Sequence, residues 1–205
     1  MSFMRECYAF SSEYIGLAEI SGPKDNRMIE VSHRLTNIEG NSGGSYTDEI
    51  PWCSSWIVLV MVCVNIRRNP KRSADRLRKR GIPEGTIIEL FGYAKVDYNK
   101  MKDVDTGINF IEPTWSASSK SWDTWGRSVP TSKAQRGDLL RFTRDGGGHI
   151  TQLDADSLGL LMVKCLGGNQ SNKVTSGANY ARTRLVHVRR AIEDVDQPTD
   201  IGSLT

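Results

Sequence analysis

The stretch PWCSSWIVLVMVCV, residues 51–64, contains the longest apolar run of the chain, from Trp56 to Val64. The run is too short to cross a bilayer, which takes about 20 apolar residues in a helix. Because it is apolar on every side, it predicts a helix buried in a core. A buried strand is the alternative, because β-branched residues are common in the run. Pro51, preceded by Asp48 and Glu49, favours the helix, since such residues are typical of helix starts.

Cys53 stands just ahead of the run and would lie in the first turn of that helix. Backbone N–H groups and the positive end of the helix dipole stabilise a thiolate there. Such placement can lower a thiol pKa from about 8.5 to roughly 3.5–7.5. The sequence therefore makes Cys53 a candidate nucleophile. The alternative is that Cys53 is one more small buried residue, a common role for free cysteine.

The chain has 205 residues, of which 38% are hydrophobic and 25% are charged, as in ordinary globular proteins. We expect a single domain over residues 1–192, with an insertion at about 67–115 and a polar tail at 193–205. The first eight residues lack the basic start and apolar core of a secretory signal, so we expect a cytoplasmic product without a signal peptide. The four cysteines show no CxxC spacing. This argues against a zinc site and a disulfide framework, and we expect no metal and no cofactor.

The segment from Arg67 to Arg80 concentrates positive charge. It contains eight basic residues and one acid, a local charge of +7, so the remainder carries −4 within a total of +3. Such a run can bind an anionic surface of the cell wall or of a membrane. A solvated helix face is the alternative. No aromatic residues interleave with the run, so we expect no specific nucleic-acid partner.

The first half of the chain predicts helices, at residues 6–20 and at Asn26–Leu35, and a flexible glycine-rich loop at 40–46. Residues 86–115 favour one or two short strands and a long loop. A short helix is expected over Ser116–Gly126, with Trp122 and Trp125 on one side. Tryptophans at this spacing pack in a core or, near a cleft, stack on sugar rings.

The second half alternates between short apolar segments and glycine or aspartate turns. Strands are expected at Asp138–Arg144, His149–Leu153, Leu160–Leu166 and Leu185–Ala191. Short strands joined by such turns indicate an antiparallel sheet. Helices followed by strands indicate an α+β domain, with the core helix laid across the sheet.

His149 opens one of these strands after three glycines, and Asn169 and Gln170 follow the next strand. A hairpin connection would bring Asn169 toward His149. Cysteine, histidine and asparagine in this order suit a nucleophile, its base and an amide that orients the base. The alternatives are a turn histidine with satisfied hydrogen bonds and an asparagine that tolerates turn geometry.

Five motifs in this order are similar to those of a known family. PWCSSW, SASSKSWDTWG, RGDLLRF, GGGHITQL and LGGNQSNKV resemble the NlpC-type cell-wall cysteine peptidases and the related CHAP amidases. The resemblance is strongest to a subgroup common in phage lysis genes, whose opening helix and turn YIGLAEISGPKDNRMIE also matches. It covers about residues 12–66 and 116–190. Residues 67–115 depart from the family, which usually has a much shorter connection there.

The resemblance implies a papain-like fold and hydrolysis of an amide bond in the stem peptides or crosslinks of peptidoglycan. In that reading Cys53 is the nucleophile, His149 the base and Asn169 the group that orients it. Trp52, Trp122, Trp125 and Gln170 are then expected to contact substrate. The protein would act as a monomeric phage endolysin on the periplasmic wall, reached through a permeabilised membrane, inside a virus particle or by injection.

Two other functions remain open at this point. A muramidase or lytic transglycosylase would use Glu19 or Glu49 as its acid and cut sugar bonds in the same substrate. A non-catalytic wall-binding or virion protein would keep the fold without turnover and adhere through the basic run.

Overall fold

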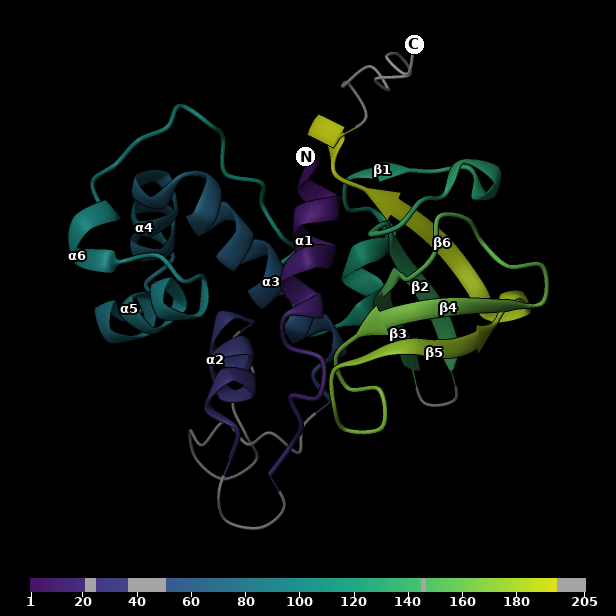
Figure 1. Cartoon of the computed structure of the whole chain (residues 1–205). Helices are drawn as coiled ribbons and strands as arrows, with labels where there is room; N and C mark the ends of the chain where they lie inside the picture. The colour runs from purple at the N-terminus through teal and green to yellow at the C-terminus, as the bar shows by residue number, and fades with distance from the viewer. Residues whose placement is uncertain (21–24, 37–50, 145–146, 195–205) are drawn as a thin grey trace.

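The computed structural model describes residues 1–20, 25–36, 51–144 and 147–194, which form an α+β arrangement of helices with a six-stranded antiparallel sheet (Figure 1). The α-helices are α1 (Phe3–Ser12), α2 (Arg27–Leu35), α3 (Cys53–Arg68), α4 (Pro70–Lys79), α5 (Glu84–Tyr93) and α6 (Tyr98–Met101). The strands are β1 (Arg127–Ser128), β2 (Leu139–Arg144), β3 (Gly147–Leu153), β4 (Met162–Gly167), β5 (Thr175–Ala181) and β6 (Leu185–Arg190). Short 3-10 helices are η1 (Ser119–Asp123), η2 (Thr131–Lys133), η3 (Arg182–Arg184) and η4 (Ile192–Asp194).

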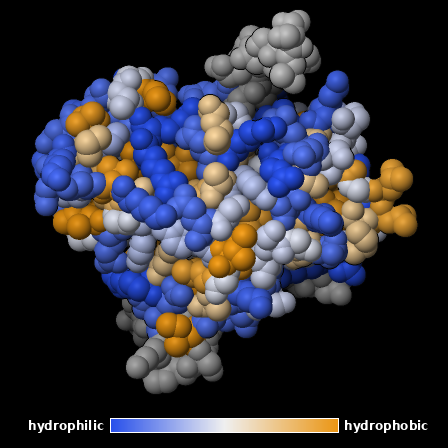
Figure 2. Space-filling view, in the orientation of Figure 1, coloured by the Kyte–Doolittle hydropathy of each residue, from blue (hydrophilic) through white to orange (hydrophobic). Residues whose placement is uncertain are grey.

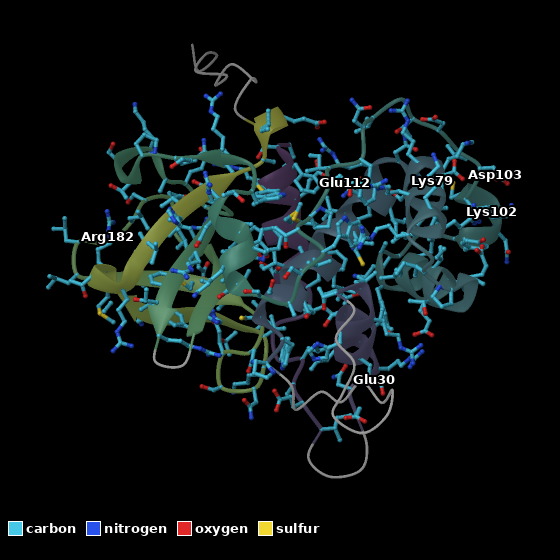
Figure 3. The ribbon with its side chains drawn as sticks, turned by 180° about the vertical axis from the view of Figure 1, so that it is seen from behind. Glu30, Lys79, Lys102, Asp103, Glu112 and Arg182 are labelled. Carbon is cyan, nitrogen blue, oxygen red and sulfur yellow. The ribbon has the colours of Figure 1, made fainter. Side chains whose placement is uncertain are left out.

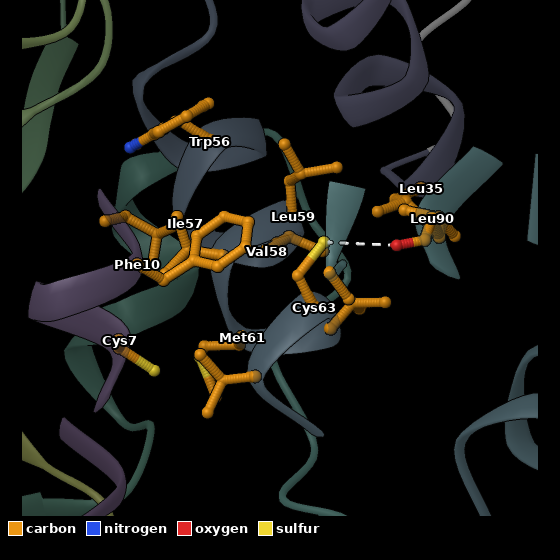
Figure 4. Close-up of a cluster of buried hydrophobic side chains, with 14 of the residues drawn as sticks. Cys7, Phe10, Leu35, Trp56, Ile57, Val58, Leu59, Met61, Cys63 and Leu90 are labelled. Atoms are coloured by element: carbon orange, nitrogen blue, oxygen red, sulfur yellow. Dashed lines mark hydrogen bonds between the residues drawn. The ribbon is translucent and has the colours of Figure 1, made fainter. Parts of the chain in front are cut away.

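Helix α3 confirms the helix predicted for the apolar run, and Cys53 is its first residue. Every residue from Cys53 to Ile66 is buried, because α1, α2, α4, α5 and strand β3 all pack around it. Figure 4 shows part of this core, where the Cys63 thiol donates to the Leu90 carbonyl oxygen of α5 at 3.8 Å. Helices α4 to α6 lie on one side of the molecule and the sheet on the other, with α1 and α3 between them (Figure 1).

The basic run forms the end of α3 and the whole of α4. Asn69 caps α4 by accepting the Arg72 N–H at 3.2 Å, and Pro70 occupies its first turn, where a missing N–H costs little. The apolar face of α4, with Ala74 and Leu77, is buried against the core. The basic side chains therefore lie on the other face.

Two sequence expectations about helices and strands were wrong. Residues 86–115 do not begin with strands, because Ile87, Leu90 and Phe91 recur at helical spacing and bury one face of α5. The helix expected over residues 6–20 ends at Ser12. Beyond it the chain turns at Gly16, whose φ is +95°, and Gly16 N–H donates to the Val174 carbonyl at 2.9 Å.

The sheet has the strand order β1-β6-β2-β3-β4-β5. Strands β2, β3, β4 and β6 confirm the four segments expected from alternation, with small differences at their ends. Strand β5 was not expected, because TSGANYA has a single β-branched residue, Thr175, and contains glycine, asparagine and alanine, which are depleted in strands. The helix expected over Ser116–Gly126 is the shorter 3-10 helix η1.

The two faces of the sheet belong to different cores. Ile150 of β3 packs into the large core around α3, whereas Phe142 of β2 belongs to a smaller cluster on the opposite face. His149 pairs with Phe142 and so shares its face. The Tyr180 ring of β5 stacks on both, with centroids 5.0 Å from Phe142 and 5.1 Å from His149. Because β5 and β2 are not neighbours in the sheet, these contacts require the sheet to curl around the smaller cluster.

Within the described ranges, no helix combines the length and the apolar character that crossing a membrane would need.

Candidate active site

The Cys53 thiol lies where the start of α3 meets strand β3. Its sulfur interacts with the backbone N–H of Ile150, the residue after His149, and with the N–H groups of Ser54 and Cys53 itself. Trp52 makes no side-chain cap at the start of α3, which leaves first-turn N–H groups to the sulfur. The structure therefore brings the thiol within one residue of His149, although 96 positions separate Cys53 and His149 in the sequence.

The electrostatics of Cys53 differ from the sequence expectation. Burial raises the pKa of the Cys53 thiol above its usual value, and the Ile150 N–H and the Arg144 cation only partly offset this. Cys53 is 5% exposed. In this closed arrangement desolvation outweighs the helix terminus, so the group is a neutral thiol.

His149 is more deeply enclosed than Cys53. It is 1% exposed, and burial, assisted by the Arg144 cation, lowers the pKa of His149 to about 4. Neither ring nitrogen has a hydrogen-bond partner among the described residues, and the ring is held by stacking on Tyr180 at an interplanar angle of 21°. His149 is thus a neutral imidazole with a free acceptor nitrogen, which is the state a general base requires.

Asn169 and Gln170 occupy the turn after β4 but do not hold the His149 ring in this structure. Asn169 is partly exposed and has a φ of +55°, the left-handed conformation that asparagine tolerates. The buried Gln170 amide donates to Thr151 Oγ1 at 2.8 Å and accepts from Thr175 Oγ1 at 2.7 Å. Gln170 therefore ties β3 to β5, and the orienting role assigned to Asn169 stays a prediction.

Two of the three tryptophans expected to contact substrate are core residues, so that expectation was wrong for them. Trp52 and Trp122 are fully buried. Trp52 Nε1 donates to Glu19 at 2.8 Å, and Trp122 Nε1 donates to Ser54 Oγ at 2.8 Å. These two side chains therefore pack around the start of α3 and hold it in place, so they position Cys53 rather than contact substrate. Gly168 must be glycine for the same reason, because a Cβ there would lie 2.4 Å from the Trp52 ring.

Trp125 is partly exposed and lines a pocket of about 330 Å³, together with Phe110, Ile111 and Glu112. Its ring packs edge-on against Trp122 at 5.3 Å, which confirms the packing interpretation of the pair. The Ile111 carbonyl accepts from Asn65, three turns along α3 from Cys53, so this pocket is remote from the thiol.

Sequence reasoning missed Tyr180 and Arg144. The Tyr180 ring stacks on His149, and the hydroxyl is electrostatically coupled to Cys53; burial raises the pKa of Tyr180 to about 12. Arg144 acts on all three of Cys53, His149 and Tyr180. Tyr180 also ends a groove of about 480 Å³ along β5 that begins at Gln170. No local signal in TSGANYA marks Tyr180, because its role depends on the curl of the sheet.

The basic run is largely neutralised by acids, most of them from other segments of the chain. Six of its eight cations form ion pairs: Arg67 with Glu13, Arg68 with Glu6 and Glu193, Lys71 with Asp75, Arg72 with Asp105, Arg76 with Glu112, and Arg78 with Asp75 and Glu84. Arg80 lies over the Trp115 ring at 4.2 Å. The charge offered to an anionic surface is therefore far below +7, and binding through this run stays a prediction.

Several expectations fall outside the described residues: the loop at 40–46, the candidate acid Glu49, and the oxyanion donors sought near Tyr46 and Asp48. The other candidate acid, Glu19, accepts the Trp52 indole N–H. Among the described residues, no three histidine, cysteine or carboxylate side chains gather as metal ligands would.

Comparisons with known proteins add no assignment to this geometry: no model of a protein family, no curated protein and no solved structure matches the chain.

Proposed function

We propose that the protein is a cysteine peptidase or amidase that hydrolyses an amide bond in the stem peptides or crosslinks of peptidoglycan. The observation that carries this is the meeting of Cys53, at the first turn of a buried helix, with the strand position next to His149. Thiol nucleophiles are activated by a helix start together with a neighbouring imidazole. Here the sulfur reaches the backbone next to His149, and the thiol and the ring are not hydrogen-bonded in this closed arrangement. The five motifs that resemble NlpC-type and CHAP enzymes supply the substrate class, and a papain-like fold belongs to the same proposal.

The chemistry follows from the neutral pair. The free nitrogen of His149 takes the Cys53 proton, and the sulfur attacks the amide carbonyl carbon to form a tetrahedral adduct. The Cys53 backbone N–H then donates to the oxyanion. The C–N bond breaks as His149 returns the proton to the leaving amine, which leaves a thioester on Cys53. Water, deprotonated by His149, hydrolyses the thioester and restores the thiol.

Burial of both groups implies that substrate entry changes their surroundings. An ion pair of thiolate and imidazolium is disfavoured while both are desolvated, because burial penalises each charged form. The groove along β5 ends at Tyr180, which covers the His149 ring. We assign this groove to the acyl side of the stem peptide, with displacement of the Tyr180 ring as the step that opens the pair.

Digestion of purified sacculi tests the proposal. Mass spectrometry of the soluble fragments should show new free amines, which appear in wild type and are absent in Cys53→Ser. Cys63→Ser is the matched control, because Cys63 lies buried in the same helix and far from β3. New reducing or anhydro sugar ends would instead establish a glycosidase or lytic transglycosylase. Sedimentation with sacculi without any release of fragments would establish a wall-binding protein.

A further inference from the structure

The turn that leads into β4 exposes three consecutive large apolar residues, Leu160, Leu161 and Met162, here called the apolar tip. Leu160 is 94% exposed, Leu161 82% and Met162 48%. Figure 2 shows apolar atoms projecting from the margin of the molecule at the place where β4 begins in Figure 1. Single exposed apolar residues are common, but three in a row at the surface call for a functional reason.

The apolar tip is an ordered part of the fold. Arg182 N–H donates to the Leu161 carbonyl at 2.8 Å, and Met162 pairs with Ala181 across β4 and β5. The turn brings the backbone of Gly159 close to that of Met162. A side chain does not fit at position 159, since a Cβ there would lie 2.0 Å from the Met162 carbonyl oxygen. The backbone is thus tied down while the leucine side chains point outward, so their exposure is built into the turn.

Cations border the apolar tip. Lys164 follows it on β4, and Arg182 and Arg184 lie in η3, which packs against it through the Arg182 bonds. None of these three cations forms an ion pair within the described residues, in contrast to the basic run. The nearest acids along the chain, Asp154 and Asp156, are already engaged by Arg136. Figure 3 shows Arg182 on one side of the molecule and Lys79 of α4 on the opposite side.

We propose that the apolar tip inserts into the interfacial region of an anionic phospholipid bilayer, with Arg182 and Arg184 binding lipid phosphates. The tip is convex, so a protein partner would need a matching socket, whereas a bilayer surface accepts a protruding apolar point directly. Guanidinium groups bind phosphate oxygens bidentately, and unpaired ones retain their full charge for this purpose. The inference does not depend on the peptidoglycan activity, because it uses none of the residues around Cys53.

Vesicle sedimentation with the full chain tests this. Phosphatidylglycerol–phosphatidylcholine vesicles should pellet the protein, and phosphatidylcholine vesicles should pellet much less. The variant Leu160→Ser/Leu161→Ser should bind about tenfold more weakly for each leucine removed. Arg182→Gln/Arg184→Gln should bind about fivefold more weakly for each charge and should show a shallower salt dependence.

Matched controls sit elsewhere on the surface. Ile88→Ser replaces an apolar residue that is 48% exposed on α5, and Lys120→Gln removes an exposed cation of η1, outside the apolar tip and the basic run; both should bind as wild type does. A tryptophan placed by Leu161→Trp should shift its emission to the blue on anionic vesicles, which reports insertion directly. Absence of vesicle binding at low salt, or equal binding by the tip variants, would overturn the proposal. Loss of a dimer in the leucine variant, seen by analytical ultracentrifugation without vesicles, would assign the tip to a second copy instead.

Discussion

The helix side and the sheet side of the candidate active site are built differently. Cys53 begins a helix that is buried from Cys53 to Ile66, and Trp52 and Trp122 fix its start through hydrogen bonds to Glu19 and Ser54. His149 lies on the face of β3 that packs against the smaller hydrophobic cluster. Its ring has no hydrogen-bond partner within the described residues. The nucleophile side is therefore positioned by a large core and by hydrogen bonds, whereas the imidazole is held by packing, including the stack on Tyr180, without a hydrogen bond to a described residue.

This difference indicates which of the two residues can move when substrate binds. Moving Cys53 would disturb the largest core of the protein, which is costly because interiors are close-packed. Turning the His149 ring breaks no hydrogen bond to a described residue, and it requires the Tyr180 ring that stacks on it to move. We therefore expect the base side to adapt to substrate while the nucleophile side stays fixed.

The largest effect belongs to the fixed side. Cys53→Ala and Cys53→Ser should abolish release of wall fragments while the thermal unfolding midpoint stays close to that of wild type. Iodoacetamide should label Cys53 before Cys7, Cys63 or Cys165, because the other three are more deeply buried and the Cys53 sulfur lies near the Ile150 N–H and is acted on by the Arg144 cation. Full lytic activity in Cys53→Ala would show that Cys53 is not the nucleophile, and the two sides of the site would then have no catalytic roles to compare.

The next effect belongs to the adaptable side. His149→Ala should lower turnover by about 10²–10⁴-fold, the usual contribution of a general acid–base group, and loss of thiol activation adds to this. Single-turnover kinetics on a soluble stem-peptide substrate measures it. Retention of more than a tenth of the wild-type rate would show that another group activates Cys53.

The sequence predicted the fixed side better than the adaptable one, for a physical reason. An apolar run with a thiol at its start reads as a buried helix whatever surrounds it, so α3 and Cys53 could be placed directly. His149 could be placed on a strand by alternation. The neighbours of its ring could not be placed, because the contact with Tyr180 arises from the curl of a sheet whose fifth strand has only a weak strand signal.

The misread segment at 86–115 has a related cause. Thr86, Ile87 and Ile88 favour a strand by propensity, but burial of one helical face decides the outcome in α5. The basic run shows that charge counted along the chain is not charge on the surface. Its acidic partners Glu13, Glu84 and Asp105 come from three other segments, so the sequence of the run alone does not predict these ion pairs.

His149 should also make stability depend on pH. The pKa of its imidazole is about 4 in the folded protein and about 6.5 when unfolded, so below pH 6.5 the unfolded chain takes up a proton that the folded chain does not. The contribution of His149 to the free energy of unfolding is fully present above pH 6.5. It is lost as the pH falls toward 4 and amounts to up to about 3 kcal/mol. Urea unfolding at pH 7, 5.5 and 4.5 measures this. His149→Gln should flatten that part of the profile, and an unchanged slope would mean that His149 is not buried as a neutral ring.

Tyr180 tests whether stacking alone positions the base. Tyr180→Phe keeps the stack and should retain most activity, whereas Tyr180→Ala should slow turnover by about tenfold. Removing the ring also exposes His149, so its pKa should rise from about 4 toward its usual value. The acid limb of the pH–rate profile should therefore move to higher pH in Tyr180→Ala and stay in place in Tyr180→Phe. An acid limb at the same pH in Tyr180→Ala and Tyr180→Phe would contradict a positioning role for Tyr180.

The smallest effect on turnover should come from the turn after β4, where two amides compete for the orienting role. If Asn169 reaches His149 when substrate displaces Tyr180, Asn169→Ala should slow turnover a few-fold, and Asn169→Asp should keep the rate because a carboxylate accepts the same ring N–H. Asn169→Gly controls for the positive φ, since glycine adopts it freely. Gln170→Ala should instead cost stability, about 1–3 kcal/mol, because Thr151 and Thr175 lose a buried partner. Unchanged turnover in Asn169→Ala, with a loss in Gln170→Ala larger than its unfolding explains, would transfer the orienting role to Gln170.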